Sequence, residues 1–382
     1  MQHVVKRAER SRRARWSFGV VVALTAAFGL AACGGSSNSS SSASSSAPAA
    51  SSSTSSASSS TTSASSASSS SGGGLKTGLN VYVIPKNLGN NYFTVADSVK
   101  TGGALAALQA LGEKGTETSG SAATAASQLP AIQASLSKGA NALIVSGTDP
   151  TALCPTLKSA MSRGITVVTY DSDAPTCRSL FVNQASTAAI GTSEVDLLAK
   201  QLGSKGDIAI VSAAASATNQ NAWIAFMKQE LKKYPNMHLV SIVYGNDDPT
   251  TATQVTNGLL QKYPNLKGII SPTTVGIAAA AGVLDTPQYR GKIKLTGLGT
   301  PLSLKKFVDD GTIDGFELWD PAKLGYLAAY AAVNVASKKI TGTSGESFTA
   351  GKLGSYTVGP NSTIILGPPT VFTKANIDQF NF

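Results

Sequence analysis

From about residue 78 onward the chain repeats one pattern, a short run of β-branched and other apolar residues followed by a longer stretch with the amphipathic spacing of a helix. The apolar runs predict strands at 79–84, 142–146, 165–170, 180–182, 207–212, 239–244, 268–271, 293–296 and 315–318. Helices are predicted between most of them, for example over 187–202 and 221–234. Because strands and helices alternate, we expect an α/β fold with parallel sheets and helical crossovers.

These strands are too many for one small sheet, so the pattern predicts two α/β units. The short passage at 181–184 is where we expect the chain to cross from the first unit to the second. In open parallel sheets, ligands bind beyond the carboxyl ends of the strands. The residues that follow each predicted strand are therefore the candidates for a functional site.

Polar and aromatic side chains follow the strand ends in both halves of the chain. Those that we expect to contact a ligand are Lys86, Asn91, Tyr92, Phe93, Asp171, Asn219, Gln220, Trp223, Thr273, Thr274, Gly299 and Trp319. Asp, Asn and Gln can each bind two neighbouring hydroxyl groups and Lys donates several hydrogen bonds, whereas the C–H face of a sugar packs on an aromatic ring. The set favours a small polyhydroxylated ligand.

Several of these residues have a second interpretation. Trp223 lies in an apolar stripe of its predicted helix and could pack in the core instead of stacking on a ligand. Asp171 could cap the turn that follows it, although Asp173 suits that role better. Asn219 could cap a helix, and Lys86 could be solvated, as most lysines are.

The chain is basic, with 31 Lys and Arg against 21 Asp and Glu among 382 residues and a formal net charge of +10. Taken alone, this charge suggests nucleic acid or anionic lipid as a partner. Half of the excess lies within residues 1–32, where six basic residues face only Glu9. The remaining excess is small for the length that carries it, so it requires no polyanionic partner.

The basic start of the chain runs directly into an apolar segment at 18–32, which ends in small residues. This order is typical of a secretory signal, and the segment is short for a membrane span. The sequence LAACG at 30–34 resembles the lipobox of bacterial lipoproteins, a resemblance that implies cleavage before Cys33 and lipid attachment to it. We therefore interpret residues 1–32 as a lipoprotein signal peptide, with an ordinary signal peptide and an incidental cysteine as the alternative.

Residues 36–74 consist almost entirely of Ser, Ala, Thr and Gly. Such a segment has too little apolar surface to fold. Its root-mean-square span is roughly 35 Å by the scaling of flexible linkers. We expect residues 33–77 to form a lipidated cysteine followed by a disordered tether, which could also be a glycosylated stalk.

The two cysteines after Cys33 are Cys154 and Cys177. An exported protein with an even pair of cysteines favours a disulfide, so we expect these two to be bonded. His238 is the one histidine that follows the signal, and the acidic residues show no ligand spacing, so we expect no metal site and no cofactor.

At the residues that follow the strands, the chain resembles the type I periplasmic sugar-binding proteins of ABC transporters. The resemblance covers essentially all of residues 78–382 and is closest to the branch of rhamnose-binding and autoinducer-2-binding proteins. It rests on IPKNLGNNYF at 84–93, DPTALCPTLKSAMSRGITVVTYDSDAPTCRS at 149–179, TNQNAW at 218–223, FELWDPAKLGY at 316–326 and VFTKANIDQFNF at 371–382.

This resemblance implies two Rossmann-like lobes that are joined by three crossovers and enclose the ligand between them. It places 78–183 and 320–352 in the N-terminal lobe, and 184–319 and 353–382 in the C-terminal lobe. We further expect a monomer without enzymatic activity, held by its lipid alone at the outer face of the cytoplasmic membrane or in the periplasm. Such a protein captures a monosaccharide by closure of the lobes and delivers it to the permease subunits of an ABC importer.

The autoinducer-2 pattern of this branch contains a Lys and an Asp, which match Lys86 and Asp171, then an Asp-Gln pair and a Pro-x-Ala. Here the pair is Asn219-Gln220 and the last motif ends in Thr274. One carboxylate is lost, which removes a strong acceptor, and Thr274 adds bulk and a hydroxyl. The stretches LWDPAKLGYLAAY at 318–330 and GPPTVF at 367–372 resemble the rhamnose-binding side of the branch more closely. This resemblance implies a deoxyhexose or related monosaccharide, with rhamnose as the best single expectation.

Three other function classes share parts of this pattern. An enzyme is disfavoured because no histidine lies near a plausible nucleophile and no phosphate-binding glycine loop follows a strand. A DNA-binding regulator would need a helix-turn-helix ahead of the lobes, where this chain has a signal and a tether, so nucleic acid is not an expected partner. A receptor for autoinducer-2 or another small signal remains the alternative to an uptake protein.

Overall fold

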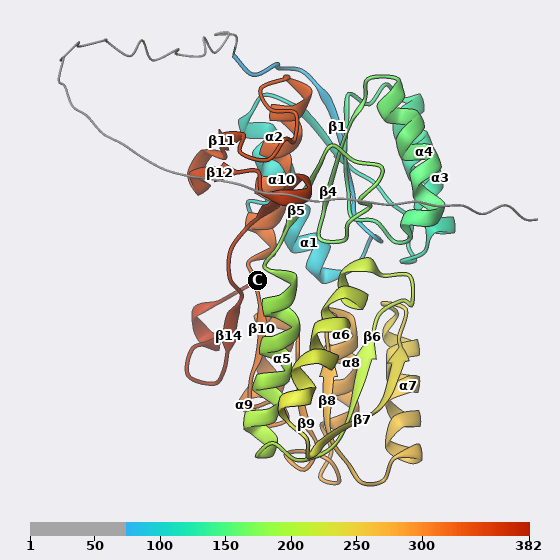
Figure 1. Ribbon diagram of the computed structural model, residues 1–382, viewed down its shortest axis with the longest axis vertical. Coiled ribbons are helices and arrows are strands. Elements are labelled where there is room, and N and C mark those ends of the chain that lie inside the picture. The colour runs from blue at the N-terminus through green and yellow to red at the C-terminus, as the bar shows by residue number, and fades with distance from the viewer. Residues whose placement is uncertain (1–73) are drawn as a thin grey trace, which may run out of the picture. The chain divides into compact units, whose positions relative to one another are not determined.

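The computed structural model describes residues 74–382, so the predicted signal peptide, Cys33 and most of the predicted tether lie outside the described residues. The described residues all belong to one compact unit. They form two parallel sheets with helices on both faces of each (Figure 1). The expected α/β fold class is therefore confirmed.

The first sheet has six parallel strands in the order β13-β5-β4-β3-β1-β2. Their bounds are β1 Asn80–Ile84, β2 Lys114–Glu117, β3 Ala142–Val145, β4 Thr166–Tyr170, β5 Leu180–Asn183 and β13 Thr363–Ile365. Every residue of β3, β4 and β5 is buried, as expected for parallel strands that are covered on both faces.

Five helices cover this sheet. Helices α1 (Asn91–Asp97), α2 (Ala104–Ala110) and α10 (Pro321–Ala336) pack on one face, and α3 (Ala125–Ser137) and α4 (Pro150–Ser162) pack on the other (Figure 1). A short hairpin of β11 (Ser347–Thr349) and β12 (Ser355–Thr357) follows α10. We call the six-stranded sheet with these elements the first lobe.

The second lobe is built on a four-stranded parallel sheet in the order β7-β6-β8-β9. The strands are β6 Gly206–Ser212, β7 Met237–Tyr244, β8 Leu266–Ser271 and β9 Lys294–Gly297. The helices are α5 Thr187–Leu202, α6 Thr218–Glu230, α7 Pro249–Lys262, α8 Thr274–Leu284 and α9 Pro301–Asp309. An antiparallel pair, β10 (Phe316–Leu318) with β14 (Thr370–Phe372), lies beside β9 through a bridge between Leu298 and Glu317.

The chain passes between the two lobes three times, after β5, after β10 and after β13. The expected lobe boundary at residue 352 is wrong in one respect. Strand β13 pairs in parallel with β5, with Ile364 opposite Val182, so this part of the C-terminal segment completes the first lobe. The segment joins the second lobe only at β14.

All nine predicted strands are present, each with ends within two residues of the prediction. The helix predicted at 221–234 begins earlier, at Thr218, and its last turn is a 3-10 turn at Leu231–Lys233. No described helix is long and apolar enough to cross a membrane.

Two acidic side chains are buried where the second lobe meets its crossovers. Glu317 on β10 is 1% exposed and accepts a hydrogen bond from the Ser193 hydroxyl at 2.6 Å. Burial raises the pKa of Glu317 from 4.5 to about 7, and the bond from Ser193 only partly opposes this rise. Glu194 on α5 is fully buried, neither of its carboxyl oxygens has a partner among the described residues, and burial followed by the charge of Glu317 raises its pKa well above the usual value.

These acids predict a fold that loses stability as the pH rises. Between about pH 4.5 and 7 the folded chain holds a proton on Glu317 that the unfolded chain has released, so the free energy of unfolding falls as the pH increases through this window. The expected loss is about 3 kcal/mol across the window. Glu317→Gln should make this slope shallower by the part that Glu317 contributes, while Glu194 keeps its own part, and denaturant unfolding at a series of pH values can measure the difference. Asp309→Asn, which removes an exposed carboxylate, should keep the wild-type slope, and parallel curves for wild type and Glu317→Gln would contradict the prediction.

Candidate functional site

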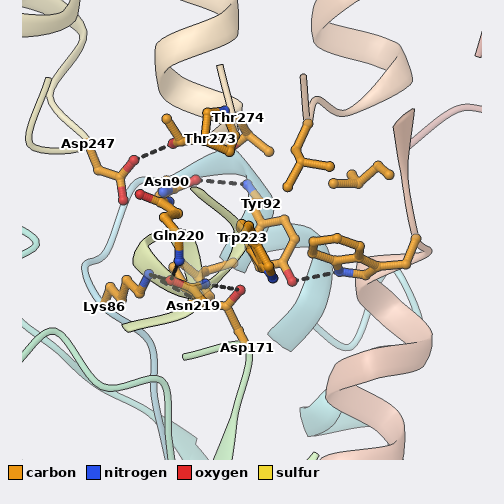
Figure 2. Close-up of a pocket in the computed structure, with 15 residues that line it drawn as sticks. Lys86, Asn90, Tyr92, Asp171, Asn219, Gln220, Trp223, Asp247, Thr273 and Thr274 are labelled. Atoms are coloured by element: carbon orange, nitrogen blue, oxygen red, sulfur yellow. Dashed lines mark hydrogen bonds and ion pairs between the residues drawn. The ribbon is translucent and has the colours of Figure 1, made fainter. Parts of the chain in front are cut away.

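A pocket between the two lobes brings together residues from both halves of the chain (Figure 2). The first lobe contributes the loop after β1, the start of α1 and the end of β4. The second lobe contributes the first turns of α6 and α8 and the loop after β7. The pocket is lined by Lys86, Asn90, Tyr92, Phe93, Asp171, Asn219, Gln220, Trp223, Asp247, Pro272, Thr273, Thr274, Leu298, Leu318 and Trp319.

Lys86 and Asp171 form the charged centre of the pocket. The Lys86 Nζ lies 3.6 Å from Asp171 Oδ1, and the two residues are only 4% and 5% exposed. The same Oδ1 accepts a hydrogen bond of 2.7 Å from the Ser146 hydroxyl. Asp171 has a φ of 60° at the end of β4, a left-handed conformation that Asp tolerates better than most residues. The buried position rules out the solvated lysine that the sequence left open.

Asn219 links the charged centre to the second lobe. Its Oδ1 accepts a hydrogen bond from Lys86 Nζ at 3.4 Å, and its Nδ2 donates to Asp171 Oδ2 at 3.5 Å. Ala217 occupies the N-cap position of α6 without a side-chain bond, and Asn219 lies inside the first turn, where its Oδ1 also accepts from the Gln220 N–H at 2.9 Å. Its amide is therefore placed to bridge the lobes, at bond lengths long enough for a ligand group to replace them.

Gln220 is fixed by its carbonyl oxygen. Its Oε1 accepts from the Ser212 hydroxyl at 3.1 Å and from the Ala213 N–H at 2.9 Å, both at the end of β6. These two bonds orient the amide so that Nε2 is the side that remains available. The Nε2 group of Gln220 is thus a hydrogen-bond donor for the pocket, and the two bonds to Oε1 fix its position.

An aromatic wall closes one side of the pocket. The Trp319 Nε1 donates to the Tyr92 hydroxyl at 2.8 Å, and the ring centroids of Trp223 and Trp319 lie 6.0 Å apart. Burial, followed by the charge of Asp171, raises the pKa of Tyr92 well above its usual value, so its hydroxyl stays protonated. Phe93 meets the Tyr92 ring edge-on, with centroids 5.1 Å apart. Trp223 fulfils both of its interpretations, because it is 2% exposed within the hydrophobic core and also lines the pocket.

Two expected site residues do not line this pocket. Asn91 is exposed as the first residue of α1 and donates to the Thr300 hydroxyl at 3.2 Å, whereas its neighbour Asn90 lines the pocket and caps α1 by accepting from the Tyr92 N–H. The Gly299 N–H donates to the Glu317 carbonyl, and a side chain at Gly299 would collide with Leu304. Leu298, one position earlier, faces the pocket instead.

Asp247 is the most informative residue that sequence reasoning missed. It follows β7, its carboxylate accepts from the Thr273 hydroxyl, and burial raises its pKa while the charge of Lys86 acts in the opposite direction. The available signal was its position after a predicted strand, the rule that found the other residues. Its sequence context, Asn246-Asp247-Asp248-Pro249, is typical of a turn followed by a helix cap. Such a context does not single out Asp247 as a site residue.

A disulfide and an ion pair brace the loop that follows Asp171. Cys154 at the start of α4 is bonded to Cys177 in this loop. Arg178 donates to both carboxyl oxygens of Asp173, at 2.8 and 2.9 Å, and Asp173 also accepts from the Ala174 N–H. Asp173 therefore has the structural role and leaves Asp171 for the pocket.

The pocket offers hydrogen bonding and ring stacking. Its lining atoms leave about 340 Å³ of empty space, part of which is open to solvent. Its polar side chains combine acceptors and donors beside aromatic rings, which suits a ligand with several hydroxyl groups and an apolar face. Within residues 74–382 no group of three or more His, Cys, Asp or Glu side chains could hold a metal ion.

Known proteins share both the sequence pattern and the fold. A family model described as "periplasmic binding protein domain" matches residues 81–340. An ABC transporter solute-binding protein from Clostridium phytofermentas, solved with bound L-rhamnose, is 36% identical with a TM-score of 0.76, and the match covers 80% of this chain and 98% of that one. LsrB from Clostridium saccharobutylicum, solved in complex with AI-2, is 26% identical with a TM-score of 0.75, covering 80% and 100% of the two chains.

A curated relative, the D-ribose/D-allose-binding protein of Pseudomonas aeruginosa, is 24% identical over 197 residues. That match covers 49% of this chain, and it spans only 60% of the length of the relative.

Proposed function

Because the chain belongs to the family of periplasmic binding protein domains, we propose that it is the extracytoplasmic sugar-binding component of an ABC importer. The family consists of substrate-binding proteins and not of enzymes. The observation that carries the proposal is the buried Lys86–Asp171 pair, which Asn219 joins to the second lobe beside an aromatic wall. Such a site binds polyols without transforming them.

The proposed ligand is a deoxyhexose, with L-rhamnose as the best single candidate. The similarity to the rhamnose-bound protein supports it, as do Asn219 and Thr274, which stand where the autoinducer-2 pattern has a carboxylate and a small residue. Rhamnose carries vicinal hydroxyls for Asp171, Gln220 and Lys86. Its methyl group and C–H face suit the rings of the aromatic wall.

The proposed mechanism is capture by closure. An open form binds the sugar on one lobe, and the amides and rings of the other lobe then complete the hydrogen bonds and stacking. Closure shifts the population toward the shape that the permease recognises. We further propose that the protein acts as a monomer and that lipid on Cys33 anchors it to the membrane, with the serine-rich segment as a tether.

A thermal-shift screen tests the ligand. The protein should be stabilised most by L-rhamnose in a panel that also contains D-ribose, D-arabinose, L-fucose and AI-2. A ligand at a hundred times its Kd should stabilise the fold by about 2.7 kcal/mol. No response to any sugar would contradict the proposed function.

A receptor for AI-2 is the second candidate, favoured by the similarity to the AI-2-bound protein. It predicts that AI-2 gives the largest shift in the same panel. Thr274 on the pocket wall and the missing carboxylate at Asn219 are the features that argue against it.

A further inference from the structure

Asp247 lies on a short loop whose backbone is tied to the end of β6. The Gly245 N–H donates to the Ser212 carbonyl at 2.8 Å and the Asn246 N–H donates to the Ala213 carbonyl at 3.0 Å. Asn246 and Asp247 have positive φ angles of 55° and 50°. Two successive left-handed residues other than glycine are uncommon, and such conformations concentrate at functional sites. The loop thus holds Asp247 in a fixed position next to Ser212 and Ala213, the two residues whose hydrogen bonds orient the Gln220 amide.

Only one of the two carboxyl oxygens of Asp247 forms a hydrogen bond within the described part of the protein. One oxygen accepts from the Thr273 hydroxyl, and the other has no hydrogen-bond partner among the described residues. The residue lines the pocket, and Figure 2 shows it at the end away from Asp171. This oxygen can accept a hydrogen bond from a ligand in the pocket, and in the absence of a ligand from water, because Asp247 is only partly buried and also lines a neighbouring surface pocket.

The charges that line the pocket also restrict the charge of the ligand. Its charged lining residues are Lys86, Asp171 and Asp247, so two carboxylates face one ammonium group. Asn219 adds hydrogen bonds without adding charge. In a partly desolvated pocket a net negative wall repels an anionic ligand.

We propose that Asp247 is a specificity-determining residue of the sugar site. It accepts a hydroxyl hydrogen bond at the end of the ligand opposite Asp171, so that each lobe supplies one carboxylate. Together the two carboxylates select a neutral sugar with free hydroxyls at both ends and exclude sugar acids and sugar phosphates. This inference rests on the proposed sugar-binding function and assigns a role to one residue within it.

Isothermal titration calorimetry on Asp247→Asn and Asp248→Asn tests this role. Asparagine tolerates a positive φ and keeps the shape of Asp247. At Asp248, which is exposed and caps α7, asparagine preserves the cap. The probes are L-rhamnose, its 2-, 3- and 4-deoxy derivatives and the aldonate L-rhamnonate. If another sugar gives the largest thermal shift, that sugar and its corresponding derivatives replace them.

We expect Asp247→Asn to weaken L-rhamnose binding about tenfold or more, with the wild-type affinity kept in Asp248→Asn. One deoxy derivative should bind weakly to the wild type and lose little more in Asp247→Asn, because the hydroxyl that Asp247 accepts is already missing. The wild type should bind L-rhamnonate far more weakly than L-rhamnose. In Asp247→Asn the difference in affinity between these two ligands should be smaller.

Three results would overturn the inference. Equal affinity of the wild type and Asp247→Asn for L-rhamnose would remove Asp247 from the site while leaving the proposed function intact. An equal loss for every deoxy derivative would mean that Asp247 only supports its loop. A wild type that binds no sugar of the panel would contradict the proposed function, and this inference with it.

Discussion

Replacing Asp171 by alanine is expected to weaken sugar binding by two or more orders of magnitude, or about 3 kcal/mol. The change removes the carboxylate that accepts from Ser146 and Asn219 and that lies beside the Lys86 ammonium group. Lys86 would then remain buried with no carboxylate beside it, and the ligand would lose its strongest acceptor. Titration of the best sugar from the thermal-shift panel into the purified variant measures the loss.

Two further variants separate this effect from damage to the fold. Alanine fits the φ of 60° at Asp171 poorly, whereas asparagine tolerates it, so Asp171→Asn removes the charge at little backbone cost. Asp314→Ala removes an exposed carboxylate before β10, at the end of that strand away from the pocket, and should leave the affinity unchanged. If Asp171→Asn and Asp171→Ala both fold and bind the sugar as tightly as wild type, Asp171 is not part of the site.

Removing the disulfide should lower the free energy of unfolding by about 3 kcal/mol, the chain-entropy value for a loop of this size. Cys154 and Cys177 are 23 residues apart and close a loop that contains β4 and Asp171. Without the bond, the unfolded chain regains the freedom of that loop. Denaturant unfolding of the Cys154→Ser, Cys177→Ser double variant measures the change.

The reducing agent dithiothreitol supplies the matched control, because reduced wild-type protein should unfold at the same denaturant concentration as the double variant. Oxidised wild-type protein should show neither Cys154 nor Cys177 as a free thiol when it is alkylated without reduction and examined by mass spectrometry. Two free thiols, or identical stability of oxidised protein and double variant, would contradict a stabilising bond.

Much of the fold could be predicted because its strands are chemically distinctive. Runs such as 142–145 and 166–170 are buried on both faces and therefore carry uninterrupted apolar or β-branched residues. Strand β2 was missed because its sequence, KGTE, has no apolar side chain. It is an edge strand that, among the described strands, pairs only with β1, and it packs against α2. Strand β13 was assigned to the wrong lobe because a run of three residues is too short for its sequence to specify which sheet edge it joins.

The site residues also fall into two groups, those that the sequence could predict and those that required the tertiary structure. Lys86, Asp171 and Trp319 could be predicted because they directly follow strands and match the pattern of a family. Asn90 and Asn91 are identical residues in sequence terms, and only the rotation of the first turn of α1 decides that Asn90 faces the pocket. Asp247 required the tertiary structure, since its role depends on Thr273, a residue 26 positions away.

The third crossover has a consequence for the order in which the molecule can be assembled. The first sheet needs β13 at one edge, and α10 covers one of its faces, so the first lobe cannot be completed from residues 74–183 alone. Residues 363–365 follow the whole sheet of the second lobe in the sequence, so they leave the ribosome or a translocation channel after it. A nascent chain therefore keeps an unfinished first sheet until the second sheet has been made, and a chain truncated before residue 363 should lose stability in the first lobe.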